Sequence, residues 1–307
     1  MNVSSRVPYQ FAGGTLLGYL AQRFSYLSES AWQELLQEGR IVCNGVCSDG
    51  TARIKAGDMI GCDLPDFDAP AVNFDYAVVY QDEWLLAINK PAGLRVHSGG
   101  RFVTANLIYH LRHSHLPPYP EANPANRLDA DTSGLILLAR DKRVLSELMR
   151  QFSEGDVEKR YLAVVAGCPS PGTGTINLPI GPVKDAAVPR YWIDQRAGKP
   201  AVTRYRALRK LSERYSLLEL SPETGRTHQL RVHLAAVGHP IAGDALYTMN
   251  DDEYLAFRRT PPPASGLTRQ ALHSQTLSFV HPVLQSPLTL IAPLAADMEQ
   301  FIRNTTA

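Results

Sequence analysis

The chain is dominated by short hydrophobic runs separated by small clusters of polar residues. Runs of four or five apolar residues bounded by turn-forming residues are typical of β-strands, and the branched and aromatic side chains within them favour the same structure. The clearest examples are Ala77–Tyr80, Trp84–Ile88, Leu135–Ala139, Tyr161–Val165 and Ser216–Leu220.

Two stretches instead have the three- to four-residue spacing of a helix. One begins after Asp141, a good N-cap, and extends to Phe152. Its apolar face is predicted to consist of Leu145, Leu148, Met149 and Phe152. The other helix is predicted over residues 228–237. Because strands and helices do not alternate regularly, the pattern predicts an α+β domain with a mixed, largely antiparallel sheet.

The first 65 residues have a pattern of their own, which predicts two helices and a small antiparallel sheet. Thr15 can cap the first helix, Ser30 begins a Ser-x-x-Gln capping box for the second, and Gly39 is a good helix stop. A predicted strand at 40–43 then leads into Asn44-Gly45, a dipeptide typical of tight hairpin turns.

Composition shifts divide the chain further. Proline and aspartate are concentrated just after residue 64, which predicts a linker over residues 66–74 between a small module at 1–65 and a larger domain at 75–307. Residues 261–268 begin with three consecutive prolines and are expected to form a mobile loop. No internal repeat is evident.

The 307 residues are 44% hydrophobic, which is enough for a substantial core and argues against wholesale disorder. Formal net charge is only +1, so the composition alone does not indicate a nucleic-acid-binding protein. The charge is uneven, however. Residues 1–70 carry 5 Lys/Arg and 8 Asp/Glu, a net of −3, which leaves 26 basic and 22 acidic residues, a net of +4, for the rest.

The cysteines and apolar runs indicate a cytoplasmic protein. The spacing of the four cysteines does not match a metal site, so we expect reduced thiols. No apolar run approaches the ~18 residues of a membrane helix, and the N-terminus lacks the apolar core of a secretory signal. We therefore expect no membrane association.

The most informative polar segment is Asn126-Arg127-Leu128-Asp129-Ala130-Asp131-Thr132-Ser133-Gly134, which immediately precedes the hydrophobic run at 135–139. It places a carboxylate and a guanidinium in a short loop beside a buried strand, where functional groups are often found. Asp, Thr, Ser and Gly are also ordinary turn residues, so a purely structural turn is the alternative.

This segment resembles the His-Arg-Leu-Asp-x-x-Thr-Ser-Gly signature of the RluA-type pseudouridine synthases, which isomerise uridine in ribosomal and transfer RNA. Asn126 stands where that family usually has His. Further matches follow in the family's order over roughly residues 74–295, which makes the resemblance far more specific than one motif. They are Asn89-Lys90-Pro91-Ala92-Gly93, Lys159-Arg160-Tyr161-Leu162-Ala163, Gly225-Arg226-Thr227-His228-Gln229-Leu230-Arg231, Gly238-His239-Pro240 and Leu272-His273-Ser274.

The resemblance implies a pseudouridine synthase fold and a set of roles. Asp129 would be the catalytic carboxylate, attacking ribose C1′ or removing the 2′ proton, and Arg226 would keep it ionised. Tyr161 would lie against the uracil. The alternatives are a surface ion pair for Arg226 and a core tyrosine for Tyr161.

RNA-binding roles are implied for Arg127, Asn126, Lys90 and His228. Arg127 would help to hold RNA with the target nucleotide flipped out. Lys90 contacts phosphate or is a solvated strand end, and His228 has a hydrogen-bonding role. His228 and His233 are not spaced to stack as a metal pair, and Asp131 is expected to be a solvated turn residue.

Residues 1–65 resemble the S4-type RNA-binding module that many members of this family carry. The module usually has Arg where Glu29 stands, and acidic charge opposes binding to phosphate. RNA binding and a structural appendage therefore both stay open for this module.

We expect an RNA pseudouridine synthase that acts on structured RNA, ribosomal RNA first and transfer RNA second. The isomerisation involves no net redox change, so no cofactor and no metal are expected. A non-catalytic RNA-binding protein on the same scaffold is the alternative. A glycosidic-bond hydrolase is a third possibility, but it lacks a convincing second carboxylate. We expect a monomer whose partner is RNA.

Overall fold

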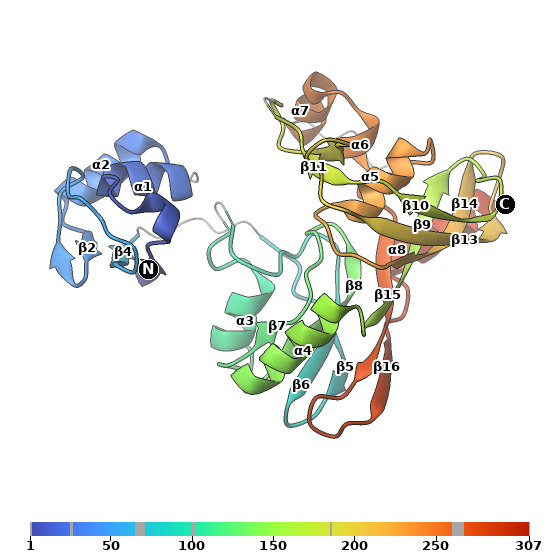
Figure 1. Ribbon diagram of the computed structural model, residues 1–307, viewed down its shortest axis with the longest axis horizontal. Helices are drawn as coiled ribbons and strands as arrows, with labels where there is room; N and C mark the ends of the chain where they lie inside the picture. The colour runs from blue at the N-terminus through green and yellow to red at the C-terminus, as the bar shows by residue number, and fades with distance from the viewer. Residues whose placement is uncertain are drawn as a thin grey trace. The chain divides into compact units, whose positions relative to one another are not determined.

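The computed structural model describes residues 2–24, 27–64, 71–99, 102–184, 186–259 and 267–306 (Figure 1). It divides into two compact units, the first made of Met1–Ala71 and Ser98–Ala105, and the second of Val72–His97 and Asn106–Ala307. The predicted module at 1–65 falls within the first unit, whereas the inclusion of Ser98–Ala105 was not anticipated. Residues 66–70 of the predicted linker lie outside the described residues.

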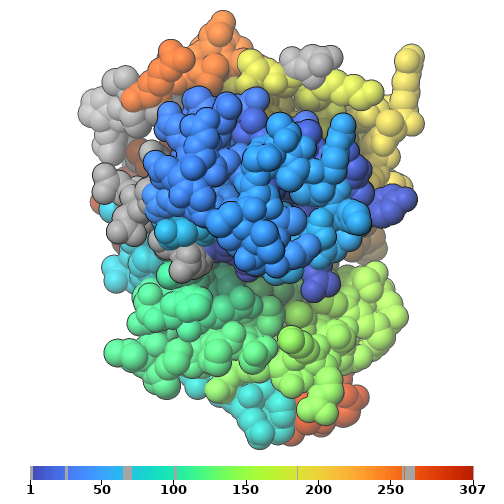
Figure 2. Space-filling model, turned by 90° about the vertical axis from the view of Figure 1, so that its left-hand side faces the viewer, coloured from blue at the N-terminus to red at the C-terminus, as the bar shows by residue number. Residues whose placement is uncertain are grey.

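The first unit contains the two helices and the small antiparallel sheet that the sequence predicts, and its N-terminal part is the compact blue body in Figure 2. Its strands pair in the order β1-β4-β2-β3. The elements are β1 (Asn2–Arg6), the 3-10 helix η1 (Tyr9–Phe11), α1 (Leu16–Arg23), α2 (Glu29–Gln37), β2 (Ile41–Cys43), β3 (Val46–Cys47) and β4 (Met59–Asp63).

Local signals account for most of this unit. The Thr15 hydroxyl accepts the Gly18 N–H at 3.2 Å and caps α1. The predicted cap of α2 was wrong by two residues, because Ser28 rather than Ser30 accepts the Ala31 N–H. Asn44 and Gly45 have φ angles of 52° and 82°, so they form the left-handed turn that closes the β2–β3 hairpin.

The second unit is built on a ten-stranded sheet with the order β10-β13-β14-β9-β15-β8-β6-β5, to which β16 and β7 are added on β15 and β8. Its strands are β5 (Ala77–Gln81), β6 (Leu85–Lys90), β7 (Asn123–Pro124), β8 (Ser133–Ala139), β9 (Glu158–Ala166), β10 (Thr173–Asn177), β13 (Val202–Lys210), β14 (Tyr215–Pro222), β15 (Leu272–Val280) and β16 (Pro287–Ile291). Among the described strands of this sheet, only β8 and β15 pair in parallel. The predicted mixed, largely antiparallel α+β architecture is thus confirmed.

The remaining elements of this unit are a two-stranded sheet and six helices within the described ranges. They are β11 (Ile180–Pro182), β12 (Tyr191–Ile193), α3 (Leu107–His113), α4 (Lys142–Glu154), α5 (Gln229–Ala236), α6 (Ala245–Thr248), α7 (Asp251–Arg259) and α8 (Ala296–Thr306). The predicted helices at 141–152 and 228–237 correspond to α4 and α5. The predicted mobile loop at 261–268 lies largely outside the described residues.

Strand β8 is buried along its whole length, which explains why its sequence is a continuous hydrophobic run. Helix α4 packs on one face of the sheet, where Val144 and Leu148 belong to the same cluster as Leu135 and Leu137. Helix α3 packs on the opposite face. Met149, predicted on the apolar side of α4, is instead 49% exposed.

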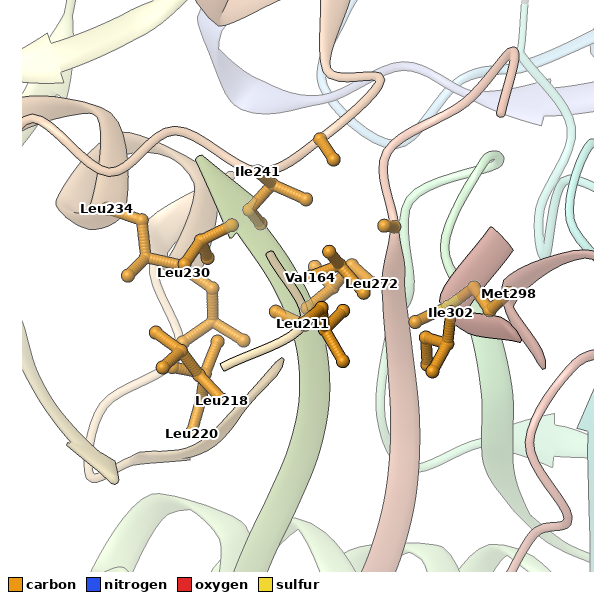
Figure 3. Packing of buried hydrophobic residues seen from close by; sticks show 14 of the residues in the cluster. Val164, Leu211, Leu218, Leu220, Leu230, Leu234, Ile241, Leu272, Met298 and Ile302 are labelled. Atoms are coloured by element: carbon orange, nitrogen blue, oxygen red, sulfur yellow. The ribbon is translucent and has the colours of Figure 1, made fainter. Parts of the chain in front are cut away.

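A second core fixes α5 against the other half of the sheet. Leu230 and Leu234 of α5 lie against β9 and β14, as Figure 3 shows, and they are all but excluded from solvent. Met298 and Ile302 of α8 belong to the same cluster. Burial of this kind stabilises by about 1.5–3 kcal/mol for each large apolar side chain, and it makes α5 a rigid support for the polar residues that it carries.

Candidate active site

The segment with Asp129 forms a loop that enters β8, and its backbone is held by neighbouring elements. The Ala130 carbonyl accepts the Gly93 N–H at 2.9 Å and the Lys90 Nζ at 2.8 Å. The Thr132 hydroxyl accepts the side-chain amide of Gln270 at 3.1 Å. These contacts fix the path of the loop around Asp129.

Lys90 was predicted to contact phosphate or solvent, and the structure contradicts both. Its side chain is fully buried, and its ammonium donates to the carbonyls of Pro91, Leu94 and Ala130 at 2.8–2.9 Å. Burial lowers the pKa of Lys90 to about 7, since only carbonyl dipoles receive its charge directly. Lys90 therefore supports the Asp129 loop from inside the protein.

The Asp129 carboxylate is paired with Arg231 rather than with the predicted Arg226. Arg231 Nη1 lies 2.8 Å from Asp129 Oδ2. The same guanidinium donates from Nε and Nη2 to the two oxygens of Asp244, at 2.7 and 2.8 Å. Asp244 is almost fully buried, whereas the Asp129 side chain is 30% exposed. The arginine thus joins a buried carboxylate to a partly exposed one.

The sequence prediction failed here because both arginines lie in the same motif. Arg226 precedes α5, is exposed, and donates through Nε to the Pro200 carbonyl at 2.9 Å. Arg231 lies inside α5 between Leu230 and Val232, where every neighbouring position is buried. An arginine with apolar neighbours on both sides in a helix signals a buried, paired charge, and that signal was available in the sequence.

The electrostatics of the pair are well defined. Burial opposes the charge on Arg231, but its hydrogen bonds to Asp244 and Asp129 and its attraction to both raise its pKa above the ordinary value. Arg231 is therefore always protonated. Its guanidinium also lies 5.0 Å from the centre of the Tyr247 ring.

His228, for which a hydrogen-bonding role was predicted, lies beside Asp129. Its Nε2 is 3.6 Å from Asp129 Oδ2, and its Nδ1 is 2.8 Å from the Tyr247 hydroxyl. Burial lowers the pKa of His228, so the ring is neutral at pH 7. Because the Tyr247 hydroxyl already accepts the Tyr191 N–H at 3.3 Å, we assign its own proton to Nδ1, which leaves the ring hydrogen on Nε2 facing the carboxylate.

His228 also has an unusual backbone conformation. Its φ angle is 56°, in the left-handed region that residues other than glycine rarely adopt. This conformation ends the loop and starts α5, and it costs about 1 kcal/mol. Strain of this kind is often found where a side chain must be directed into a site.

Tyr161 lies on β9 opposite Ser274 of β15 and Leu220 of β14. Burial, and to a smaller extent the Asp129 charge, raise the pKa of Tyr161 to about 12, so its hydroxyl stays protonated. Ser274 is fully buried, and its interaction with the Tyr161 hydroxyl partly offsets this rise in pKa.

Asn126, for which an RNA contact was predicted, has its side chain engaged with the protein backbone. Its side-chain amide donates to the Leu135 carbonyl at 3.1 Å and accepts the Leu137 N–H at 2.8 Å. It thus pairs with the backbone of β8. Arg127, in contrast, is exposed and accessible to a ligand.

Gly134 marks a close approach of β8 to β15. Its φ angle is 110°, and a Cβ atom there would lie 2.2 Å from the Ser274 carbonyl oxygen. Only glycine allows this close pairing, which places the Asp129 loop and the Tyr161 strand on either side of β15.

The described ranges contain no group of three or more His, Cys, Asp or Glu side chains that could hold a metal ion. His233, which the sequence analysis did not favour as a ligand, is bonded to the Thr203 hydroxyl and the Leu178 carbonyl. Within the same ranges no helix has the length and apolar character needed to span a bilayer.

Comparison with known proteins places this site in a family. Residues 84–236 match the RNA pseudouridylate synthase family model. The chain is 36% identical over 314 residues to ribosomal large subunit pseudouridine synthase D of Xylella fastidiosa (strain Temecula1), covering 96% of this chain and 90% of that protein. It is 35% identical over 298 residues to an uncharacterized RNA pseudouridine synthase of Synechocystis, covering 92% of this chain and 86% of the relative.

A solved structure agrees. Human RNA pseudouridylate synthase domain containing 4 superposes with a TM-score of 0.56 at 28% identity, over 75% of this chain and 92% of the human one. The relatives match nearly the whole chain, and the matched family region contains Asp129, Tyr161 and Arg231. The chain belongs to the RluA-type family of RNA pseudouridine synthases, enzymes that isomerise uridine in RNA.

Proposed function

We propose that this enzyme acts on large-subunit ribosomal RNA and that Asp129 is its catalytic carboxylate. The proposal for the RNA rests on the relatives from Xylella fastidiosa and Xanthomonas campestris, which are both ribosomal large subunit pseudouridine synthases D. The proposal for the residue rests on one observation above all, the clamp of Asp129 Oδ2 by a guanidinium that Asp244 holds in place.

The clamp supplies what the reaction needs. In the isomerisation the bond from C1′ to N1 breaks, the uracil turns, a bond from C1′ to C5 forms, the C5 proton leaves, and N1 gains a proton. Asp129 attacks C1′ or removes the 2′ proton, and either step requires an ionised carboxylate. Arg231 places a fixed positive charge 2.8 Å from Oδ2, and a contact with Oδ2 alone leaves Oδ1 for the substrate.

The neighbouring side chains have supporting roles in this proposal. Tyr161, a protonated phenol, lies against the uracil and can take part in proton transfer at C5. His228 directs Nε2–H towards Asp129 and helps to orient it. Arg127 contacts the RNA while the target uridine is flipped out, which costs a few kcal/mol and least in unpaired regions.

The test uses RNA labelled with tritium at uridine C5, because forming the new bond at C5 releases that atom to water. Wild-type protein is incubated with unmodified transcripts of large-subunit ribosomal RNA and, separately, of transfer RNA. We expect release from the ribosomal transcript. Release from transfer RNA alone would overturn the proposed substrate and leave the chemistry standing.

The matched pair of variants is Asp129→Asn and Asp131→Asn, two isosteric changes in the same loop. Asp129→Asn should abolish tritium release and bind RNA nearly as tightly as the wild type. Asp131→Asn should stay active. If Asp129→Asn keeps wild-type turnover, Asp129 is not the catalytic residue. If the wild type binds both RNAs and releases tritium from neither, the non-catalytic alternative is favoured.

We also propose that the enzyme works as a monomer in the cytoplasm, without metal or cofactor. Light scattering of the purified protein at micromolar concentration should give a mass near 33.8 kDa. Turnover should be unchanged after dialysis against EDTA. A doubled mass, or activity that requires added metal, would contradict the respective part of the proposal.

A further inference from the structure

A two-stranded hairpin lies beside the active site and packs against α5. Strands β11 and β12 pair from Ile180 to Pro182 and from Tyr191 to Ile193. Tyr191 and Ile193, at alternate positions of β12, pack into a small cluster. Its other members are Ile180, Ala201, Val232 and Tyr247. Because side chains alternate along a strand, the side chain of Trp192 leaves β12 on the side opposite to those of Tyr191 and Ile193.

Trp192 is exposed although it lies next to the site. It is 39% exposed, and the residue opposite it on β11 is Gly181, which has no side chain to cover it. One part of its ring stacks on Tyr247, with centroids 6.1 Å apart and planes at 21°. Tyr247 in turn contacts both Arg231 and His228. The indole is therefore separated by a single ring from the cation that holds Asp129.

The same hairpin concentrates positive charge. Residues 180–200 contain four basic and two acidic residues, a net of +2 in a chain whose total is only +1. Lys184, Arg196 and Lys199 are exposed. Asp194 accepts the N–H groups of Arg196 and Ala197 at 3.0 Å, so its carboxylate is engaged in a turn.

The hairpin is also held by α7, through the residues that precede β12. Asp251 of α7 forms an ion pair with Arg190 and accepts the Ala187 N–H at 3.1 Å. Together with the packing on α5, this contact restricts movement of the hairpin relative to the active site. An aromatic ring on a hairpin that is restrained in this way loses little conformational entropy when it binds a ligand.

We propose that Trp192 is a stacking platform for an unpaired nucleobase next to the target uridine, and that Lys184, Arg196 and Lys199 hold the adjoining phosphates. This inference rests on the proposed function, because it assumes RNA at Asp129. Flat bases stack on exposed aromatic rings in single-stranded RNA, and phosphates bind lysine and arginine. The enzyme then selects uridines whose neighbour can leave the RNA helix.

The experiment is a double-mutant cycle between protein and RNA. RNA hairpins carry the target uridine in a loop, with either normal neighbours or an abasic nucleotide on one side of it. Dissociation constants are measured for full-length wild type, Trp192→Ala and Trp192→Phe. Leu284→Ala, an exposed apolar residue between β15 and β16, is the matched control.

We expect Trp192→Ala to weaken binding of the normal hairpin about tenfold, in line with the usual contribution of one stacked base. Trp192→Phe should recover most of the loss, and Leu284→Ala should have no effect. With the abasic RNA on the correct side, wild type and Trp192→Ala should bind equally. If Trp192→Ala loses the same affinity for normal and abasic RNAs, or loses none, Trp192 is not a stacking platform.

Turnover measured on the same RNAs separates this proposal from the proposed function. If the wild type releases tritium and Trp192→Ala raises KM without changing kcat, the platform is supported. If the wild type releases no tritium but the double-mutant binding cycle is non-additive, the stacking role of Trp192 is supported and the proposed activity is wrong. If Trp192→Ala lowers only kcat, the residue shapes the active site and the platform is wrong.

Discussion

Raising the pH above 7 should stabilise this protein through Lys90. The pKa of Lys90 falls from its ordinary value of 10.5 to about 7 in the folded protein because the side chain is buried. Between these two values the unfolded chain binds the proton more tightly than the folded one, so the free energy of unfolding rises with pH. Below about pH 7 both states are protonated, and the cost of burying the charge is present in full.

The size of the effect follows from the pKa difference. The full interval, 10.5 to about 7, corresponds to roughly 5 kcal/mol at about 1.4 kcal/mol per pH unit. Between pH 7 and pH 9 the expected gain is about 2 kcal/mol, because the folded lysine is only half protonated at the start of that interval. This is a large part of the 5–15 kcal/mol by which proteins are typically stable.

The measurement compares wild type with Lys90→Met in urea, from pH 6 to pH 9.5. Trp84, which packs against the core of the second unit, reports unfolding in a background where the other two tryptophans are replaced by Phe. All other titrating groups are common to both proteins, so the difference between the two profiles isolates Lys90. Lys199→Met, at an exposed position, controls for the loss of one positive charge.

We expect the stability difference between wild type and Lys90→Met to shift in favour of the wild type by about 2 kcal/mol between pH 7 and pH 9. The Lys199→Met profile should run parallel to that of the wild type. If the profile of Lys90→Met also runs parallel to that of the wild type, the buried lysine does not titrate in this range. The reasoning from its burial would then be refuted.

Two further predictions concern the geometry of the site. Arg231→Met should abolish turnover and lower the free energy of unfolding by about 3–5 kcal/mol, because it leaves Asp244 buried without its cation. Arg226→Met should keep the wild-type kcat, because Arg226 does not contact Asp129. Tritium release and urea unfolding of both variants check this, and equal turnover would show that Arg231 is dispensable. Gly134→Ala should cost at least about 3 kcal/mol, since its Cβ would meet the Ser274 carbonyl, and an unchanged urea midpoint would contradict the close pairing of β8 with β15.

Much of the architecture was predictable because its signals are local. The run at 135–139 is hydrophobic at every position, and the structure buries every one of those positions in β8. Asp141 and Thr15 cap the helices that they were expected to cap. Several strands and helices were not predicted, among them β13 and α8. The exposed half of β13 carries arginines and a lysine instead of an alternating apolar pattern, so its place in the sheet depends on its neighbours.

The functional family was also accessible from sequence, because the order of its motifs survives in the chain. The roles within those motifs were less accessible. Arg226 and Arg231 lie five residues apart, and only the packing of α5, which contains Arg231 and begins after Arg226, determines which of them meets Asp129. Asn126 was expected to contact RNA, but it pairs with the backbone of β8.

Local sequence therefore determined which residues could do chemistry, since capping, hydrophobic periodicity and motif order all act over a few positions. Tertiary structure alone decided which charges meet, because Asp129 and Arg231 are 102 positions apart and are joined only when α5 packs on the sheet. Lys90 makes the same point. Its lysine side chain suggests exposure, and only the assembled fold surrounds it with three carbonyl oxygens and removes it from water.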